Sequence, residues 1–251
     1  MTLVKPLLGT PLLTHHPLAY GLVGCWLFNE GAGLIAADSS GNGNHGTLTN
    51  MANPGTPTSG WTSGPNGGAL AFDQHDDTVN CGNPAALQIG MGSVFAAVKD
   101  SVSDTSFHGI SVKQNAYGMF VSNHNFRVYS WGVHGTGKDT GISLNDGSWH
   151  RVGFTFYSAF ESVSQCYIDG KPVGTPFVVE VVSQTTGLSI SGGTNPIVVD
   201  SQIWGGLISD VMIWNRALSA EEVAYLYAQP YCMFDPDFHS IGIPIVGHRW
   251  R

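Results

Sequence analysis

The chain has few charged residues and no long apolar run, and both shortages exclude classes of protein. Only 11% of its 251 residues are charged, and the formal net charge is -8. The ten Lys and Arg are scattered, so no basic stripe is available to bind nucleic-acid phosphates. No stretch approaches the ~20 apolar residues that cross a bilayer, and Pro6 and Pro11 break the apolar start that a signal peptide needs. We therefore expect neither a nucleic-acid partner nor membrane insertion.

The sequence also lacks the patterns of several catalytic sites. Its five glutamates form no Glu-x-Asp-x-x-Glu pattern, whereas a retaining glycoside hydrolase needs two carboxylates about 5 Å apart. No Gly-x-Ser-x-Gly elbow is present, and the ten histidines fall in no His-Glu-x-x-His or Cys/His zinc spacing. These absences predict no catalytic residues, so we expect a protein that is not an enzyme.

Glycine and proline, by contrast, are abundant. The 33 Gly and 13 Pro separate short runs rich in β-branched and aromatic residues, such as 117–122, 125–131 and 151–157. Many strands joined by turns require this pattern. No linker divides the chain, which favours one all-β domain. Three of the four cysteines, Cys25, Cys81 and Cys166, lie in strand-like runs, which favours free thiols, although disulfide pairing stays open.

The stretch 206–228 changes from the period of a strand to the period of a helix. From Leu207 to Trp214, every second residue belongs to one of two sets, as the two faces of a strand require. One set is Leu207, Ser209, Val211 and Ile213, and the other is Ile208, Asp210, Met212 and Trp214. Ser219 then stands three residues before Glu222, which is the spacing of a capping box. The pattern predicts a strand that leads directly into one short helix.

Five motifs, in the same order, resemble the laminin-G-like family. They are residues 21–33 with the loop 38–48, residues 67–80, 147–156, 166–173 and 206–228. The resemblance implies an all-β, concanavalin A-like antiparallel β-sandwich (jelly roll) with one short C-terminal helix. It covers residues 20–229 and leaves an extended N-terminal arm, 1–19, and an extended C-terminal arm, 230–251.

Both arms are apolar but too irregular for a helix, so they need something to cover them. Two alternatives stay open: the arms dock onto the sandwich itself, or onto a neighbouring subunit or larger particle. The start 22–31, the loop 43–51 and the exit 230–234 also resemble proteins encoded in bacteriophage and prophage genomes.

That second resemblance implies a noncatalytic virion surface protein that decorates the capsid or tail. Residues 1–19 and 230–251 would anchor the laminin-G-like head to other virion proteins. We expect a homo-oligomer that is made in the host cytoplasm without a signal peptide and lies on the virion surface. The alternative is an extracellular, carbohydrate-binding adhesion module, and a glycoside-active enzyme comes third.

The loop 38–44 favours calcium as a structural ion. Asp38, Asn42 and Asn44 supply carboxylate and amide oxygens within seven residues, and oxygen ligands suit Ca²⁺. The laminin-G-like resemblance adds Asp210 of the last strand as a fourth ligand. The alternative is that the loop residues make Asx-turns. Asp73, Asp76 and Asp77 form a second acidic turn, in which like charges at close range favour either a bound cation or full solvation, and we expect solvation.

A glycan is the other possible ligand. Sugar recognition needs aromatic faces and a few fixed polar groups. Trp131 and Trp204 are the candidates because each lies beside a glycine-rich loop. Burial in the core or at a sheet edge is the alternative for both. The resemblance places Trp26, Trp149 and Trp214 at strand positions that pack in the core.

Overall fold

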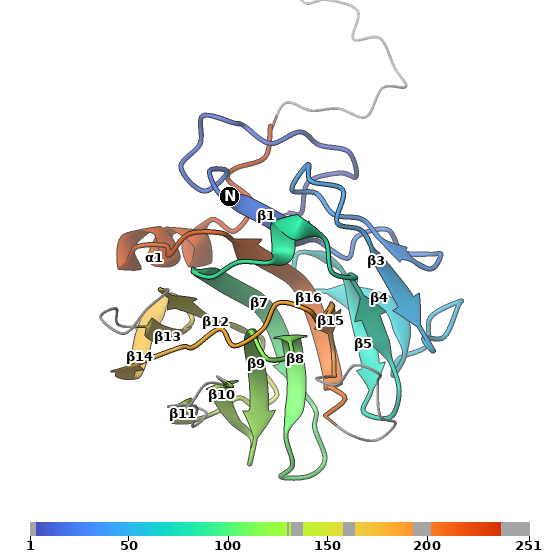
Figure 1. The fold of residues 1–251 in the computed structure, drawn as a ribbon. Coiled ribbons are helices and arrows are strands. Elements are labelled where there is room, and N and C mark those ends of the chain that lie inside the picture. The colour runs from blue at the N-terminus through green and yellow to red at the C-terminus, as the bar shows by residue number, and fades with distance from the viewer. Residues whose placement is uncertain (1–3, 130, 132–137, 158–163, 193–201, 237–251) are drawn as a thin grey trace, which may run out of the picture.

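The computed structural model describes residues 4–129, 131, 138–157, 164–192 and 202–236. Within these ranges the chain forms two antiparallel sheets, which pack face to face, and one α-helix (Figure 1). The first sheet has the order β14-β13-β12-β7-β16-β5-β4, with β1 beside β16, and the second has the order β11-β10-β9-β8-β15-β6-β3-β2. This arrangement confirms the predicted β-sandwich.

The elements have the following bounds: β1 (Leu22–Trp26), β2 (Ile35–Ala36), β3 (Gly46–Thr49), β4 (Gly60–Gly64), β5 (Gly67–Asp73), β6 (Thr78–Asn80), β7 (Gly92–Asp100), β8 (His108–Lys113), β9 (Tyr117–Ser122), β10 (Asn125–Tyr129), β11 (Lys138–Ser143), β12 (His150–Phe156), β13 (Ser164–Ile168), β14 (Lys171–Phe177), β15 (Leu188–Ile190), β16 (Gly205–Trp214) and α1 (Ala220–Ala228). A 3-10 turn, Ala85–Leu87, precedes β7. No helix in the described ranges is long and apolar enough to span a membrane.

β16 is an inner strand of the first sheet, with neighbours on both of its edges. It pairs with β7 along one edge, while β5 and then β1 share its other edge. Val211 and Ile213 face the core between the sheets, and Met212 and Trp214 face the opposite side. All four side chains are fully buried, because both faces of the strand are covered. The alternation seen in the sequence therefore separates two cores.

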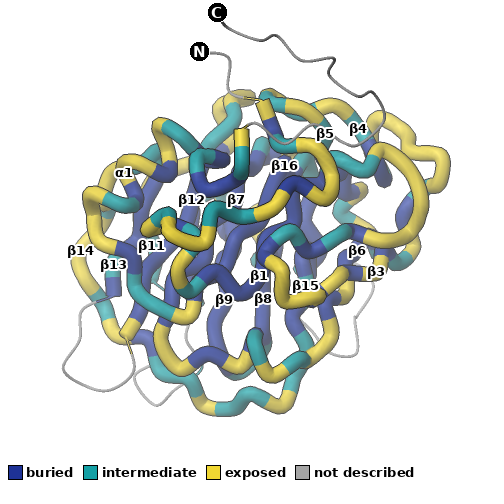
Figure 2. Tube along the Cα trace, turned by 90° about the horizontal axis from the view of Figure 1, so that it is seen from above, coloured by how far each residue is buried: buried dark blue, intermediate teal, exposed yellow. Residues whose placement is uncertain are grey.

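Figure 2 shows the strands largely buried and the connecting loops largely exposed. The main core lies between the sheets and includes Trp26 and Phe154. A second apolar cluster covers the outer face of the first sheet. In it, Trp214 and Phe95 contact each other edge to face, with ring centroids 6.3 Å apart. The predicted core positions of Trp26 and Trp214 are confirmed, whereas Trp149 is only half-buried.

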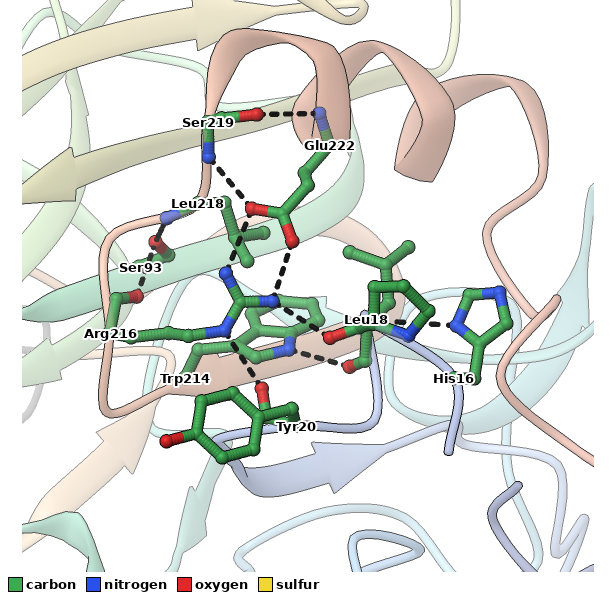
Figure 3. Close-up of polar contacts among 10 residues, drawn as sticks. His16, Leu18, Tyr20, Ser93, Trp214, Arg216, Leu218, Ser219 and Glu222 are labelled. Atoms are coloured by element: carbon green, nitrogen blue, oxygen red, sulfur yellow. Dashed lines mark hydrogen bonds and ion pairs between the residues drawn. The ribbon is translucent and has the colours of Figure 1, made fainter. Parts of the chain in front are cut away.

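The predicted capping box and helix are confirmed (Figure 3). The Ser219 hydroxyl accepts the Glu222 amide, and the Glu222 carboxylate accepts the Ser219 amide. Arg216 forms two hydrogen bonds with the same carboxylate, at 2.7 and 2.8 Å, and also donates to the Tyr20 carbonyl. The helix start is thereby joined to the N-terminal segment.

The described parts of both arms, 4–19 and 230–236, pack on the sandwich. Leu12 pairs with Phe234 in an isolated β-bridge, and the Leu13 amide donates to the Met233 carbonyl at 2.8 Å. This is the arrangement of the first alternative, docking onto the sandwich itself. Residues 237–251 of the C-terminal arm and residues 1–3 of the N-terminal arm lie outside the described residues.

Lys5 fastens the N-terminal arm to the first sheet. Its ammonium donates to the carbonyls of Leu27 and Ser209, both at 2.6 Å, and to that of Gly68. Burial lowers the pKa of Lys5 to about 8, although the nearby Asp210 carboxylate opposes this shift. Lys5 is only 5% exposed. Its ammonium can be buried here because three carbonyl dipoles replace the water molecules that would otherwise hydrate it.

All four cysteines are free thiols, as the sequence favoured. Cys25, Cys81 and Cys166 are buried, and burial raises the pKa of Cys166 to about 12. A thiol that stays protonated is a poor nucleophile, so these residues act as apolar core side chains.

Candidate functional site

Asp38 organises the loop that was predicted to bind calcium. One carboxylate oxygen accepts the backbone amides of Cys25 and Ser40, each at 2.9 Å. The other accepts the Ser40 hydroxyl at 2.8 Å and the Asn44 amide at 2.9 Å. Asn42 and Asn44 donate their side-chain amides to carbonyls of β1, Leu22 and Val23. These are the contacts expected if the loop residues make Asx-turns, which was the alternative to calcium binding. They also connect the loop to β1.

Asp210, the fourth predicted calcium ligand, is paired with Arg151. The two guanidinium nitrogens donate to its two carboxylate oxygens at 2.7 and 2.9 Å, and the Tyr231 hydroxyl donates at 2.9 Å. Burial alone would raise the pKa of Asp210, but Arg151 holds it below its ordinary value. Calcium at Asp38, Asn42, Asn44 and Asp210 stays a prediction, and it would require the ion to replace these partners.

The acidic turn between β5 and β6 differs from the expectation of a fully solvated loop. One carboxylate oxygen each from Asp73, Asp76 and Asp77 lies within 4.8 Å of the others, a grouping of acidic, His or Cys ligands found at no other place in the described residues. Asp73 is exposed, but Asp77 is 0% exposed, and burial raises its pKa to about 6. Asp77 is buried because one oxygen accepts the Asp73 amide and closes the turn.

Trp204, one of the two predicted sugar-binding residues, lies in the main core. It is 0% exposed, and its backbone amide donates to the Ser191 hydroxyl at 2.9 Å. Its ring therefore presents no face on which a sugar could stack. This placement is the core alternative for Trp204.

Trp131, the other predicted sugar-binding residue, lines a pocket on the outer face of the second sheet. This pocket of about 200 Å³, which we call the aromatic pocket, is lined by six of the described residues: Phe107, Gln114, Phe120, Tyr129, Trp131 and Gln202. Trp131 is half-buried, so part of its surface remains open. The structure thus separates the two predicted sugar-binding residues, Trp131 in a surface pocket and Trp204 in the core.

The strand period explains why these aromatic side chains gather. In β9, Tyr117, Met119 and Val121 face the main core, so Phe120 and Gly118 face outward. Across the sheet, Gly118 pairs with Tyr129 of β10. A Cβ atom on Gly118 would lie 2.8 Å from Phe120 and 3.1 Å from Trp131. The glycine therefore leaves the space in which the two rings lie.

Most of the contacts between neighbouring rings of this pocket are edge to face. The centroids of Tyr129 and Trp131 are 5.1 Å apart with an interplanar angle of 69°, and those of Phe107 and Phe120 are 6.0 Å apart at 77°. Such geometry is favourable for aromatic pairs and holds each ring in place. The pocket is therefore formed by mutually supported walls, with the amide side chains of Gln114 and Gln202 beside them.

Sequence reasoning missed most of this site. The period of two in 117–122 and 125–129 could have placed Phe120 and Tyr129 on one outer face, because the rows of core residues define the other face. No local signal marks Phe107 or Gln202, because tertiary structure brings both from distant loops.

The sequence was compared with known families and with curated proteins. The family model described as the concanavalin A-like lectin/glucanases superfamily, Laminin_G_3, matches residues 73–224. No curated protein sequence matches the chain.

Solved structures with a similar fold include domain 4 of AbnA, an extracellular GH43 arabinanase from Geobacillus stearothermophilus, in complex with arabinotriose. It has a TM-score of 0.61 and 20% identity over 82% of this chain and 98% of that domain. The binding domain of Paraclostridial Mosquitocidal Protein 1 has a TM-score of 0.61 and 11% identity over 84% of this chain and 52% of that one. Trypanosoma rangeli sialidase in complex with sialic acid has a TM-score of 0.59 and 15% identity, over 85% of this chain and 34% of the sialidase chain. At these identities the likeness concerns the fold alone.

Proposed function

Because the chain belongs to the concanavalin A-like lectin/glucanase superfamily, we propose that it is a noncatalytic carbohydrate-binding module. Its binding site is the aromatic pocket. The observation that carries this proposal is the gathering of Trp131, Tyr129, Phe120 and Phe107 around one opening, with two amide side chains beside them. Sugars present apolar C–H faces and hydroxyl edges, which such a mixture of rings and amides can contact.

The neighbouring structures support a glycan as the ligand. The arabinanase domain, which this chain matches over 98% of that domain's length, was solved with a bound oligosaccharide. The sialidase was solved with a sugar acid, although the present chain matches only 34% of its length. These ligands belong to those proteins, and they make a glycan the first class to test here.

The lining of the aromatic pocket favours binding over hydrolysis. Its described residues include no carboxylate, whereas glycoside hydrolysis commonly uses a pair of them. Glu222 is paired with Arg216, and one carboxylate oxygen of Glu30 accepts the Ala37 amide, so both have structural partners. We expect no release of reducing sugar from any glycan that the protein binds.

A glycan array probed with the purified full chain tests the proposal. We expect binding that Trp131→Ala weakens about tenfold or more, because a tryptophan at the centre of a binding site commonly contributes over 1 kcal/mol. Tyr20→Ala is the matched control, since Tyr20 is an aromatic residue 73% exposed that does not line the pocket. An array without a binder, or equal loss in both variants, would contradict the proposal.

A second role, attachment to a virion, is favoured by one observation. Val4, Leu7 and Leu8 of the N-terminal arm are 64%, 54% and 46% exposed and line an open groove of about 450 Å³. Exposed apolar side chains that lie together commonly mark contacts with another protein. Electron micrographs of virions labelled against this chain test the role, and intact particles without label would argue against it.

A further inference from the structure

We propose that the aromatic pocket accepts one terminal, uncharged sugar ring and excludes acidic sugars and the middle of a glycan chain. This inference rests on the proposed function and specifies the class of glycan. Three properties of the aromatic pocket carry it: its size, the angles between its rings and its lack of charge.

The size of the pocket limits the ligand to a single ring. Its volume, about 200 Å³, is below the roughly 300–1,000 Å³ of sites that enclose drug-sized ligands. With about 30 Å³ for each water molecule in the liquid, it holds the equivalent of only six or seven waters. One sugar ring with its hydroxyls has a comparable size, and a second ring would remain outside.

The rings form a cup and not a platform. Tyr129 makes angles of 69° with Trp131, 75° with Phe120 and 88° with Phe107. Phe120 and Trp131 are inclined at 58°. A flat glycan chain stacks on aromatic faces that share one plane, which these rings do not. Inclined rings instead surround a group that enters end-on, and the end of a glycan is its terminal residue.

The depth of the cup depends on Gly118. Phe120 and Trp131 lie over this residue so closely that a methyl group there would meet both rings. Val112 of β8 lies at 3.2 Å from the same position, so the surroundings of Gly118 beneath the rings are apolar. The rings thus offer mainly apolar surface to a sugar that enters the cup, and Gln114 and Gln202 line the same pocket.

Among the described residues that line the aromatic pocket, none carries a positive charge that could balance an acidic sugar. The described lining residues are uncharged. Arg127 of β10 lies over the Phe107 ring at 5.4 Å, but it is ion-paired with Asp139. A carboxylate that enters the pocket would lose water without gaining an opposite charge.

Calorimetric titration of the full chain with a series of related glycans tests the inference. The series starts from a neutral oligosaccharide that binds on the array, and it varies chain length behind the same terminal sugar. We expect affinity to change less than about threefold from two to six units, because only the terminal ring is enclosed. Oxidation of that terminal sugar to its uronic acid should lower affinity at least tenfold, and capping its hydroxyls should do the same.

Trp131→Ala and Tyr20→Ala are titrated in parallel. The inference is overturned if affinity rises with each added unit, or if an acidic sugar binds as well as the neutral one. Such a result can occur while Trp131→Ala still abolishes binding. In that case the proposed function stands. If Trp131→Ala has no effect on any bound glycan, both the proposed function and this inference fail.

Discussion

Arg151 and Asp210 form the most deeply buried ion pair among the described residues. Their side chains are 7% and 0% exposed. Removal of one partner leaves a charge in the core without compensation, which typically costs 3–5 kcal/mol. We expect Arg151→Met to lower the unfolding free energy by about this amount in urea titrations.

Two further variants separate this cost from a general loss of packing. The double variant Arg151→Met with Asp210→Asn should recover part of the lost stability, because it removes the unpaired charge. Arg127→Met breaks an ion pair with Asp139 whose side chains are 26% and 34% exposed, and it should cost less than about 1 kcal/mol. Equal losses in Arg151→Met and Arg127→Met would contradict the expected role of burial.

His150 should make stability depend on pH. Burial alone would lower its pKa, but hydrogen bonds with Asp169 at 2.8 Å and Asp146 at 3.1 Å raise it above its ordinary value. The folded chain therefore binds this proton more tightly than the unfolded chain. The resulting stability is fully present below about pH 6.5 and is lost as the pH rises through the folded pKa.

We expect His150→Gln to be less stable than the wild type at pH 5.5 by a larger margin than at pH 8.5. Urea titrations of both chains across this range measure the difference, and the subtraction cancels the other histidines. A margin that is constant with pH would show that the two carboxylates do not stabilise a charged His150.

At the scale of the element, α1 depends on Glu222 for two contacts, the capping box and the ion pair with Arg216. We expect Glu222→Gln to lower the unfolding free energy by about 1 kcal/mol, because it weakens both contacts. Glu221→Gln is the matched control in the same turn, since Glu221 is exposed and forms no ion pair with Arg216. Thermal unfolding compares the two, and a greater loss in Glu221→Gln would refute the expectation.

The elements that could be predicted from the sequence are those with local signals. The change of period before Trp214 and the spacing of Ser219 and Glu222 predicted β16 and α1, because both patterns lie within one short stretch. The family resemblance alone predicts calcium at Asp210. Its ion pair with Arg151, 59 residues away, has no local signal, because only the sheet brings the two residues together. Trp131 could be proposed from its neighbours in sequence, but the pocket around it required the pairing of β9 with β10.

At the scale of the whole molecule, the first sheet needs the arms as a cover. Leu18, Tyr231 and Met233 are buried against its outer face, and the Leu18 carbonyl accepts the Trp214 indole N–H at 2.8 Å. The sequence placed the edges of the fold at residues 20 and 229 because the family motifs end there. The apolar character of the arms was visible, but the surface that covers them was not.

We expect deletion of residues 1–19 to expose this cluster. The truncated chain should unfold at a lower temperature and bind a hydrophobic dye, because Trp214 and its neighbours would face water. Dye fluorescence and calorimetry measure both effects. The single variant Lys5→Met, which keeps the arm but removes three hydrogen bonds, should have an intermediate stability. A truncated chain as stable as the full one would exclude a structural role for the arm.

The position of β16 has a consequence for the order in which the chain folds. This strand joins β1, β5 and β7, which all precede it by more than 100 residues in the sequence. During synthesis, those strands leave the ribosome before their common neighbour exists, and the edges that pair with β16 stay open until Trp214 has emerged. Contacts of such long sequence separation are slow to form and leave apolar strands open to aggregation. Truncation before residue 214 should therefore produce insoluble protein and not a smaller stable sandwich.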